Sequence, residues 1–180
     1  GQLATGVHAQ RTADVAALYA DAARVCTPFR EALAAVACDA GAPDALLVAP
    51  LKRCARIIEK VALNRNTRGD ASGVCDVVRG CYTVPSLKLL ADLLRALIGA
   101  AQRGVIEVVR VKDRIRHPSR AAWRDVIVNL AVTACGCRHI CEVQLTLENM
   151  SKAGKKLSEY HLYERMRNAI EIAAFGAISE

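Results

Sequence analysis

The chain has 180 residues, of which 53% are hydrophobic and 24% are charged; the length suits one domain with a sizeable core, and the composition excludes a disordered protein. Its formal net charge of +7 favours partners that carry phosphate, although a solvated basic surface is the alternative. The sequence has no apolar run long enough to span a bilayer and no secretory signal at its start, so we expect an intracellular, cytoplasmic protein without a membrane partner.

Residues 12–39 are rich in Ala, with apolar residues at helical spacing, and Pro28 predicts a break into two helices. We expect residues 1–44 to form a helical segment that packs on a domain formed by residues 45–180. A short apolar piece, Leu46–Val48, follows a turn. Residues 51–63 predict a helix in which Lys52, Arg56 and Lys60 share one side, because they recur every four positions.

The next elements mix strands with helices. Residues 74–84 are rich in β-branched residues and predict a strand, and residues 87–101 predict an amphipathic helix that ends before Gly104. Strands are expected over 105–112, 123–132 and 140–147, the last two joined by a hairpin turn at 134–137. A closing helix is expected over 148–175, and Gly154 is expected to weaken it locally. The order predicts an α+β fold with a mixed, partly antiparallel sheet and flanking helices.

Polar residues alternate with apolar ones in the last two strands. Asp125 and Asn129 alternate with valines in the first strand, and Glu142 and Gln144 alternate with apolar residues in the second. An antiparallel pair that buries one face leaves the other open. We therefore expect these four residues on the open face, where a ligand could bind.

Two acidic residues lie in segments that are mostly apolar. Glu142 lies inside a predicted strand, and Asp76 lies in the apolar segment VCDVVRG. A buried carboxylate is unfavourable unless it is paired or bound to a metal. The two acids therefore predict either an exposed sheet face or a shared divalent cation, and Mg²⁺ needs only one or two carboxylates besides phosphate oxygens.

Basic side chains surround these positions in the sequence. They could clasp a triphosphate by charge and donor geometry, or they could be solvated surface residues. Trp123, the only tryptophan, could stack on a purine or be a core aromatic. The cations are Lys52, Arg56, Lys60, Arg79, Lys112, Arg114, Arg116 and Arg120.

The eight cysteines are interpreted as small buried hydrophobic residues of an intracellular protein, including Cys26, Cys38, Cys54, Cys75 and Cys81. A second group, Cys135, Cys137, His139 and Cys141, has the spacing C-x-C-x-H-x-C. Structural zinc sites more often use cysteine pairs two to four residues apart. A hairpin is also expected to send alternate side chains to opposite faces, so the spacing argues against zinc.

Several segments, taken in order, resemble the synthetase domain of the RelA/SpoT family. They are LKRCARIIEK, VCDVVRG, VKDRIRHPSRAAWRDVIVNLAV, HICEVQLTLENM and EYHLYERMR, and they cover the chain from about Leu51 to about Arg167. The resemblance implies a nucleotidyltransferase-like fold. It also implies Mg²⁺-dependent transfer of pyrophosphate from ATP to the 3′-hydroxyl of a guanosine or other purine nucleotide, which yields an alarmone.

The resemblance also implies residue roles. Asp76 would be a Mg²⁺ ligand, and Glu142 would be a second ligand or the base that activates the acceptor hydroxyl. The basic helix would hold ATP phosphates, and Trp123 would stack on the acceptor base. The expected nucleotide-binding residues are Lys52, Arg53, Arg56, Lys60, Arg79, Lys112, Arg114, Arg120, Trp123, Asp125, Asn129, Gln144 and His161.

The sequence departs from the family pattern at Pro50, Ser119, Ala122, Asp125 and Ile127. Ile127 stands where the family has a His, and Pro50 where it has an Arg. These departures favour the alternative that the domain is catalytically inactive and binds nucleotide or RNA, or acts as a scaffold. A purely basic nucleic-acid binder is a third reading, against which the scarcity of aromatic residues speaks. Small synthetases of this family can oligomerise, so an oligomer is compatible with the resemblance.

Overall fold

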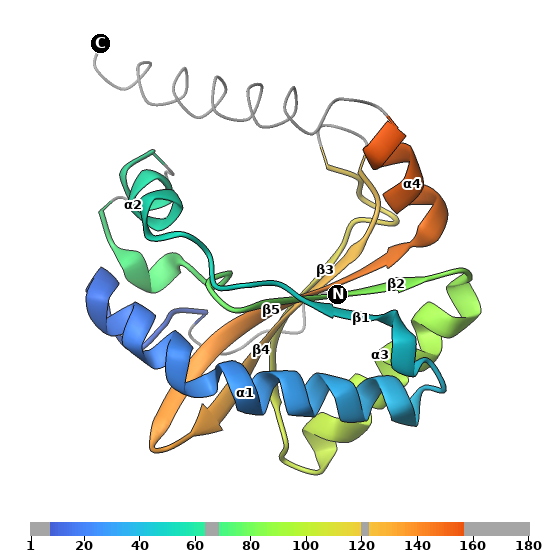
Figure 1. Ribbon diagram of the computed structural model, residues 1–180, viewed down its shortest axis with the longest axis horizontal. Helices are drawn as coiled ribbons and strands as arrows, with labels where there is room; N and C mark the ends of the chain where they lie inside the picture. Colours follow the sequence, from blue (N-terminus) through green and yellow to red (C-terminus); the bar gives the residue numbers. More distant parts are fainter. Residues whose placement is uncertain (1–7, 64–68, 120–122, 157–180) are drawn as a thin grey trace.

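A five-stranded sheet with strand order β1-β2-β5-β4-β3 organises the computed structural model (Figure 1), which describes residues 8–63, 69–119 and 123–156. Strand β1 is antiparallel to β2, β2 is parallel to β5, and β5, β4 and β3 are successively antiparallel. The expected α+β fold with a mixed, partly antiparallel sheet is therefore confirmed. The elements are α1 (Val15–Asp39), β1 (Leu46–Val48), α2 (Cys54–Leu63), β2 (Arg79–Val84), α3 (Leu87–Gln102), β3 (Glu107–Asp113), β4 (Val126–Ala134), β5 (Cys137–Leu147) and α4 (Glu148–Lys156), with short 3₁₀ turns at Pro43–Ala45 and Ala71–Gly73.

The two faces of the sheet differ in chemistry. Helices α1 and α3 lie on one side, below the sheet in Figure 1, and α2 and α4 lie above it. The lower face is apolar, because the buried side chains of both helices join alternate residues of β2, β4 and β5 in one core cluster. On the other face Asn129 lies opposite Glu142, and Ile127 opposite Gln144, so the expected shared face of Asn129, Glu142 and Gln144 is confirmed. The expectation that this face is open is wrong at Asn129 and Asp125, whose side chains are buried.

Helix α1 packs closely on the sheet at Gly80. A Cβ at this position would stand 2.7 Å from Leu33 Cδ1 and 3.4 Å from Phe29 Cζ. Leu33 and Phe29 are both fully buried. The absence of a side chain at Gly80 thus sets how near α1 can approach β2.

The expected break at Pro28 is wrong, since α1 runs unbroken from Val15 to Asp39 with Pro28 inside it. Proline removes one backbone hydrogen bond from a helix interior. The buried residues Val25, Phe29 and Leu33 hold both halves of α1 on the sheet, and this packing outweighs the local loss. Asp14 caps the helix by accepting a hydrogen bond from the Ala17 amide at 2.7 Å.

Several predicted boundaries are corrected. The helix expected over 51–63 begins only at Cys54, and the strand expected over 74–84 begins only at Arg79. Residues 74–78 instead follow an irregular path in which Val77 O accepts from the Lys52 amide and Val78 O from the Glu142 amide, each at 3.0 Å. The hairpin turn at 134–137 is confirmed, with positive φ at Cys135 and Gly136. The closing helix is described only to Lys156, so its remainder lies outside the described residues.

The expected burial of the cysteines is correct for Cys75 but wrong for Cys38 and Cys54, which are exposed at the end of α1 and the start of α2. The expectation that the 135–141 group alternates between faces is also wrong. Cys137, His139 and Cys141 are spaced two apart on β5 and share one face of it. No group of three His, Cys, Asp or Glu side chains that could hold a metal occurs among the described residues. The part of the chain that the structure describes contains no helix long and apolar enough to cross a membrane.

Candidate functional site

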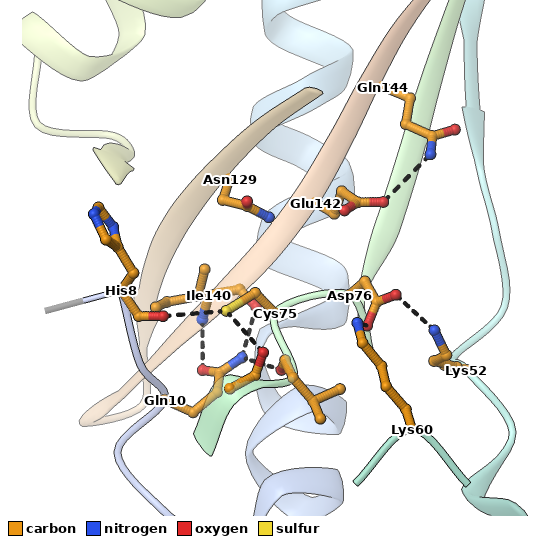
Figure 2. A network of polar contacts seen from close by, with 12 residues as sticks. His8, Gln10, Lys52, Lys60, Cys75, Asp76, Asn129, Ile140, Glu142 and Gln144 are labelled. Atoms are coloured by element: carbon orange, nitrogen blue, oxygen red, sulfur yellow. Dashed lines mark hydrogen bonds and ion pairs between the residues drawn. The ribbon is translucent and has the colours of Figure 1, made fainter. Parts of the chain in front are cut away.

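Asp76 projects from the irregular segment before β2 and is held by two lysines (Figure 2). Lys52 Nζ lies 2.6 Å from its Oδ2, and Lys60 Nζ lies 2.9 Å from its Oδ1. Burial alone would raise the pKa of Asp76, but Lys60 and Lys52 outweigh burial and lower the pKa to about 2. Asp76 is therefore a carboxylate at neutral pH, with each oxygen bound to an ammonium group.

Glu142 lies in the middle of β5, near Asp76 (Figure 2). Its Oε1 accepts a hydrogen bond from Gln144 Nε2 at 3.3 Å. Burial raises the pKa of Glu142, the negative charge of Asp76 raises it further, and Lys60, Lys112 and Lys52 only partly offset these effects. The pKa of Asp76 is thus lowered and that of Glu142 raised. Two neighbouring carboxyl groups whose pKa values are shifted in opposite directions are typical of a site in which the two groups have different chemical roles.

A row of polar side chains crosses four strands on this face. Arg79 of β2, Glu142 of β5, Asn129 of β4 and Arg110 of β3 lie at directly opposed positions. Arg110 donates to Asn129 Oδ1 from Nε at 3.0 Å and from Nη2 at 2.7 Å. Among the described residues, Asn129 Nδ2 and Arg79 Nε are buried without a hydrogen-bond partner. The row therefore presents donors on both sides of Glu142.

Arg110 was not among the residues predicted from the sequence. A β-bulge between Val108 and Arg110 shifts the pairing of β3 with β4, and this shift places Arg110 opposite Asn129. The sequence does carry one signal, because Arg110 and Lys112 are two residues apart in a strand and so share a face.

Trp123 and Asp125 form a second polar group, next to the start of β4. The Trp123 indole Nε1 donates to Asp125 Oδ2 at 3.1 Å, and Arg114 Nη1 lies 3.6 Å from Asp125 Oδ1. The Asp125 side chain is only 1% exposed, and burial raises its pKa against the opposing effects of Arg114 and Trp123. Asp125 thus fixes the orientation of the half-buried Trp123 ring.

The remaining predicted residues are placed differently. Arg56 forms an ion pair with Glu59 on its own helix, and Arg53 is exposed just before α2. Lys112 lies on β3 opposite Ile127, close enough for its charge to lower the pKa of Glu142. Arg120 and His161 lie outside the described residues.

The donor set of Asp76 and Glu142 fits Mg²⁺. Both groups supply hard carboxylate oxygens, and Mg²⁺ takes one or two carboxylates when phosphate oxygens and water complete its shell. Both Asp76 oxygens bond lysines in this structure. A metal at Asp76 therefore requires the two ammonium groups to find other anions, and the phosphates of a nucleotide are of the right charge.

No protein-family model and no curated protein matches the sequence, but several solved structures share its fold. A GTP pyrophosphokinase family protein from Streptococcus pneumoniae superposes with a TM-score of 0.58 at 14% identity, over 89% of this chain and 85% of the other. Small alarmone synthetase 1 from Bacillus subtilis gives a TM-score of 0.58 at 15% identity, over 87% and 90%. Small alarmone synthetase 2 from the same organism gives 0.58 at 12% identity, over 91% and 97%. At identities this low the superpositions show the fold alone, and by them the expected RelA/SpoT-type, nucleotidyltransferase-like architecture is confirmed.

Proposed function

We propose that this chain is a Mg²⁺-dependent pyrophosphotransferase that moves pyrophosphate from ATP to the 3′-hydroxyl of a guanosine or other purine nucleotide. The observation that carries the proposal is the arrangement of Asp76 between Lys52 and Lys60, beside Glu142. A solved structure of similar fold, small alarmone synthetase 1 from Bacillus subtilis, is bound to its product pppGpp, which supports a guanosine nucleotide as the acceptor.

The chemistry needs charge and positioning more than covalent participation of the protein. Lys52 and Lys60 would bind the ATP phosphates and so release Asp76 to hold the metal. When bound, Mg²⁺ neutralises the charge that develops on the phosphate oxygens. The acceptor hydroxyl oxygen attacks the β-phosphorus of ATP, the bond from that phosphorus to the oxygen bridging the α-phosphate breaks, and AMP leaves.

Glu142 is the candidate general base. Burial and Asp76 raise its pKa, and a base works best when its pKa approaches the working pH. Gln144 fixes one of its oxygens at 3.3 Å, so the carboxylate has a defined orientation. We assign to Glu142 the proton of the acceptor hydroxyl.

The other end of the polar face is the candidate acceptor site. Arg110 and Lys112 offer positive charge for the acceptor phosphates. Trp123, held by Asp125, offers an aromatic plane for the purine base. A base on Trp123 and phosphates on β3 would place the ribose between them, toward Glu142.

One observation favours the alternative of an inactive module that binds nucleotide or RNA. Ile127 is 2% exposed on the same face as Gln144 and Lys112, so an apolar group interrupts the polar surface next to the candidate base. A site that retains its cations and loses a polar catalytic group would still bind phosphates.

Incubation with ATP labelled at the γ-phosphate, Mg²⁺ and a panel of GDP, GTP, ADP and a short RNA separates these functions. We expect a more highly phosphorylated guanosine nucleotide, one AMP per product, and no product from Glu142→Gln. Formation of ADP instead of AMP would indicate transfer of a single phosphoryl group. Nucleotide binding without any new product in the wild-type chain would leave the binding module as the function.

A further inference from the structure

Gln10 is buried between two segments that lead into the candidate site (Figure 2). Its Nε2 donates to Val74 O at 3.0 Å and to Ile140 O at 2.8 Å. Its Oε1 accepts from the Ile140 amide at 2.9 Å, and its own backbone amide donates to Ser72 O at 2.8 Å. The side-chain amide therefore uses both of its hydrogens and its oxygen.

The position of Gln10 follows from the way the sheet opens. Strand β2 pairs with β5 only from Arg79 and Glu142 onward. Upstream, residues 74–77 are not paired with β5, so the amide and carbonyl of Ile140 face a gap where a strand partner would lie. Buried backbone groups without partners are strongly unfavourable. The Gln10 amide fills the gap as a substitute peptide group.

The two acids lie immediately beyond this cross-link. Asp76 follows Val74 by two residues, and Glu142 follows Ile140 by two residues. On the far side, Val78 O accepts from the Glu142 amide at 3.0 Å. The short segment that carries Asp76 is thus fastened to β5 at both ends, by Gln10 before it and by Glu142 after it.

We propose that Gln10 is a positioning residue, which fixes the separation of Asp76 and Glu142 by joining Val74 to Ile140. This inference rests on the proposed function for its catalytic consequence. Gln10 touches neither acid directly, so it acts through the backbone that carries them. In the proposed function both carboxylates act on the same bound nucleotides, and a displacement of about 1 Å at such a site costs on the order of a hundredfold in rate.

Gln10 also helps to anchor the N-terminal segment to the rest of the domain, and other contacts contribute to this anchoring. Arg11 Nη1 donates to Gly136 O at 3.1 Å, and Cys75 Sγ lies 3.5 Å from His8 O. Neither contact joins Val74 to Ile140. A variant of Arg11 therefore loosens the segment and leaves the cross-link in place.

The test compares Gln10→Met, which keeps the length of the side chain and removes its hydrogen bonds, with two controls. Arg11→Ala removes an exposed anchor. Tyr82→Phe removes a buried hydrogen bond to Leu33 O on the opposite face of the sheet, and so controls for the loss of a buried hydrogen bond away from the site. For each chain we would measure kcat, the KM for ATP, and the affinity for Mn²⁺ by electron paramagnetic resonance with a non-hydrolysable ATP analogue.

We expect Gln10→Met to lower kcat by about tenfold or more, and to weaken Mn²⁺ binding. Both controls should keep wild-type kcat and Mn²⁺ affinity. Wild-type values of both quantities in Gln10→Met, or equal losses in Tyr82→Phe, would overturn the positioning role.

Two further outcomes remain decisive. If Gln10→Met does not fold, Gln10→Asn keeps the amide at a shorter reach and is expected to show the same pattern. If the wild-type chain makes no product, the proposed function fails, and the Mn²⁺ titration alone decides the positioning role: an unchanged Mn²⁺ affinity in Gln10→Met refutes it.

Discussion

Asn129 Oδ1 accepts both hydrogen bonds of Arg110, at 3.0 Å and 2.7 Å, directly opposite Glu142. A guanidinium that bridges one amide oxygen in this way has a fixed direction. Asn129 thus orients the Arg110 side chain, which lies two strands from Glu142 on the same face of the sheet, and the remaining donors of Arg110 can meet an anionic ligand.

This pair predicts energetic coupling in nucleotide binding. Arg110→Ala and Asn129→Ala should each weaken acceptor binding, and the double variant should lose less than the sum, with a coupling energy of about 1 to 2 kcal/mol. Isothermal titration of the four chains with the acceptor nucleotide gives the cycle. Arg138→Ala, which breaks an exposed ion pair with Glu107, serves as the control and should change nothing. Additive losses would mean that Asn129 does not orient Arg110.

The ion pairs of Asp76 with Lys52 and Lys60 predict that replacing Asp76 increases the affinity for ATP in the absence of metal. Asp76→Asn removes the carboxylate that competes with phosphate for Lys52 and Lys60. In the presence of EDTA the variant should bind ATP about tenfold more tightly than the wild-type chain, which corresponds to about 1.4 kcal/mol. Addition of Mg²⁺ should tighten ATP binding in the wild-type chain only.

Competition titrations with a fluorescent ATP analogue, with and without EDTA, measure these affinities. Lys60→Met is the matched variant, because it removes one phosphate-binding cation and should weaken ATP binding under both conditions. Weaker ATP binding in Asp76→Asn with EDTA would show that the carboxylate does not compete for the lysines.

The antiparallel part of the sheet was predictable from the sequence. Polar and apolar residues alternate along β5 and around Asn129 in β4, and the alternation places Asn129, Glu142 and Gln144 together. The burial of β4 on both faces was not predicted by this pattern. Lys52 and Lys60 were also identified, although for a partly wrong reason. Lys52 precedes α2 instead of lying on it, and it reaches Asp76 from the extended segment before the helix.

The irregular parts of the site were not predictable from local pattern. Val74, Val77 and Val78 have the composition of a strand, but the partners of this segment are Gln10, the Lys52 amide and the Glu142 amide, which are set by tertiary contacts. The position of Arg110 opposite Asn129 depends on a β-bulge, which the sequence pattern does not reveal. A glutamine near the start of the chain carries no local signal for a contact 130 residues away.

The close approach of α1 to β2 predicts opposite effects for two glycine substitutions. Gly80→Ala places a methyl group 2.7 Å from Leu33 Cδ1, so Leu33 must move within the core, and we expect a loss of about 1 to 3 kcal/mol. Gly99→Ala lies on α3, where the nearest atom is the flexible end of Arg103 at 3.3 Å. Alanine favours a helix, so we expect a gain of up to about 1 kcal/mol. Urea unfolding of both variants checks the two signs; equal stability of Gly80→Ala and the wild-type chain would show that α1 does not depend on the small residue.

His139 predicts a loss of stability in mild acid. The side chain is 1% exposed on the face of β5 that meets the core, and its Nε2 has no hydrogen-bond partner among the described residues. Burial lowers the pKa of His139 to about 4, although Asp21 acts in the opposite direction. Because the unfolded chain binds this proton near pH 6.5, the folded state is undisturbed above that pH and loses stability as the pH falls toward 4, by at most about 3 kcal/mol.

The matched variant is His139→Leu. Its free energy of unfolding should lack the decrease that His139 causes as the pH falls from 6.5 to 4. Glu142 contributes a pH dependence of the opposite sign, because its pKa is raised in the folded state and the stability of the fold therefore falls as the pH rises. Glu142 is present in both chains, so the difference between their pH profiles isolates His139. Urea unfolding at intervals from pH 7.5 to pH 4.5 measures both profiles. Parallel profiles would show that His139 is protonated in the folded state, with Asp21 on α1 as the nearest charge able to stabilise it.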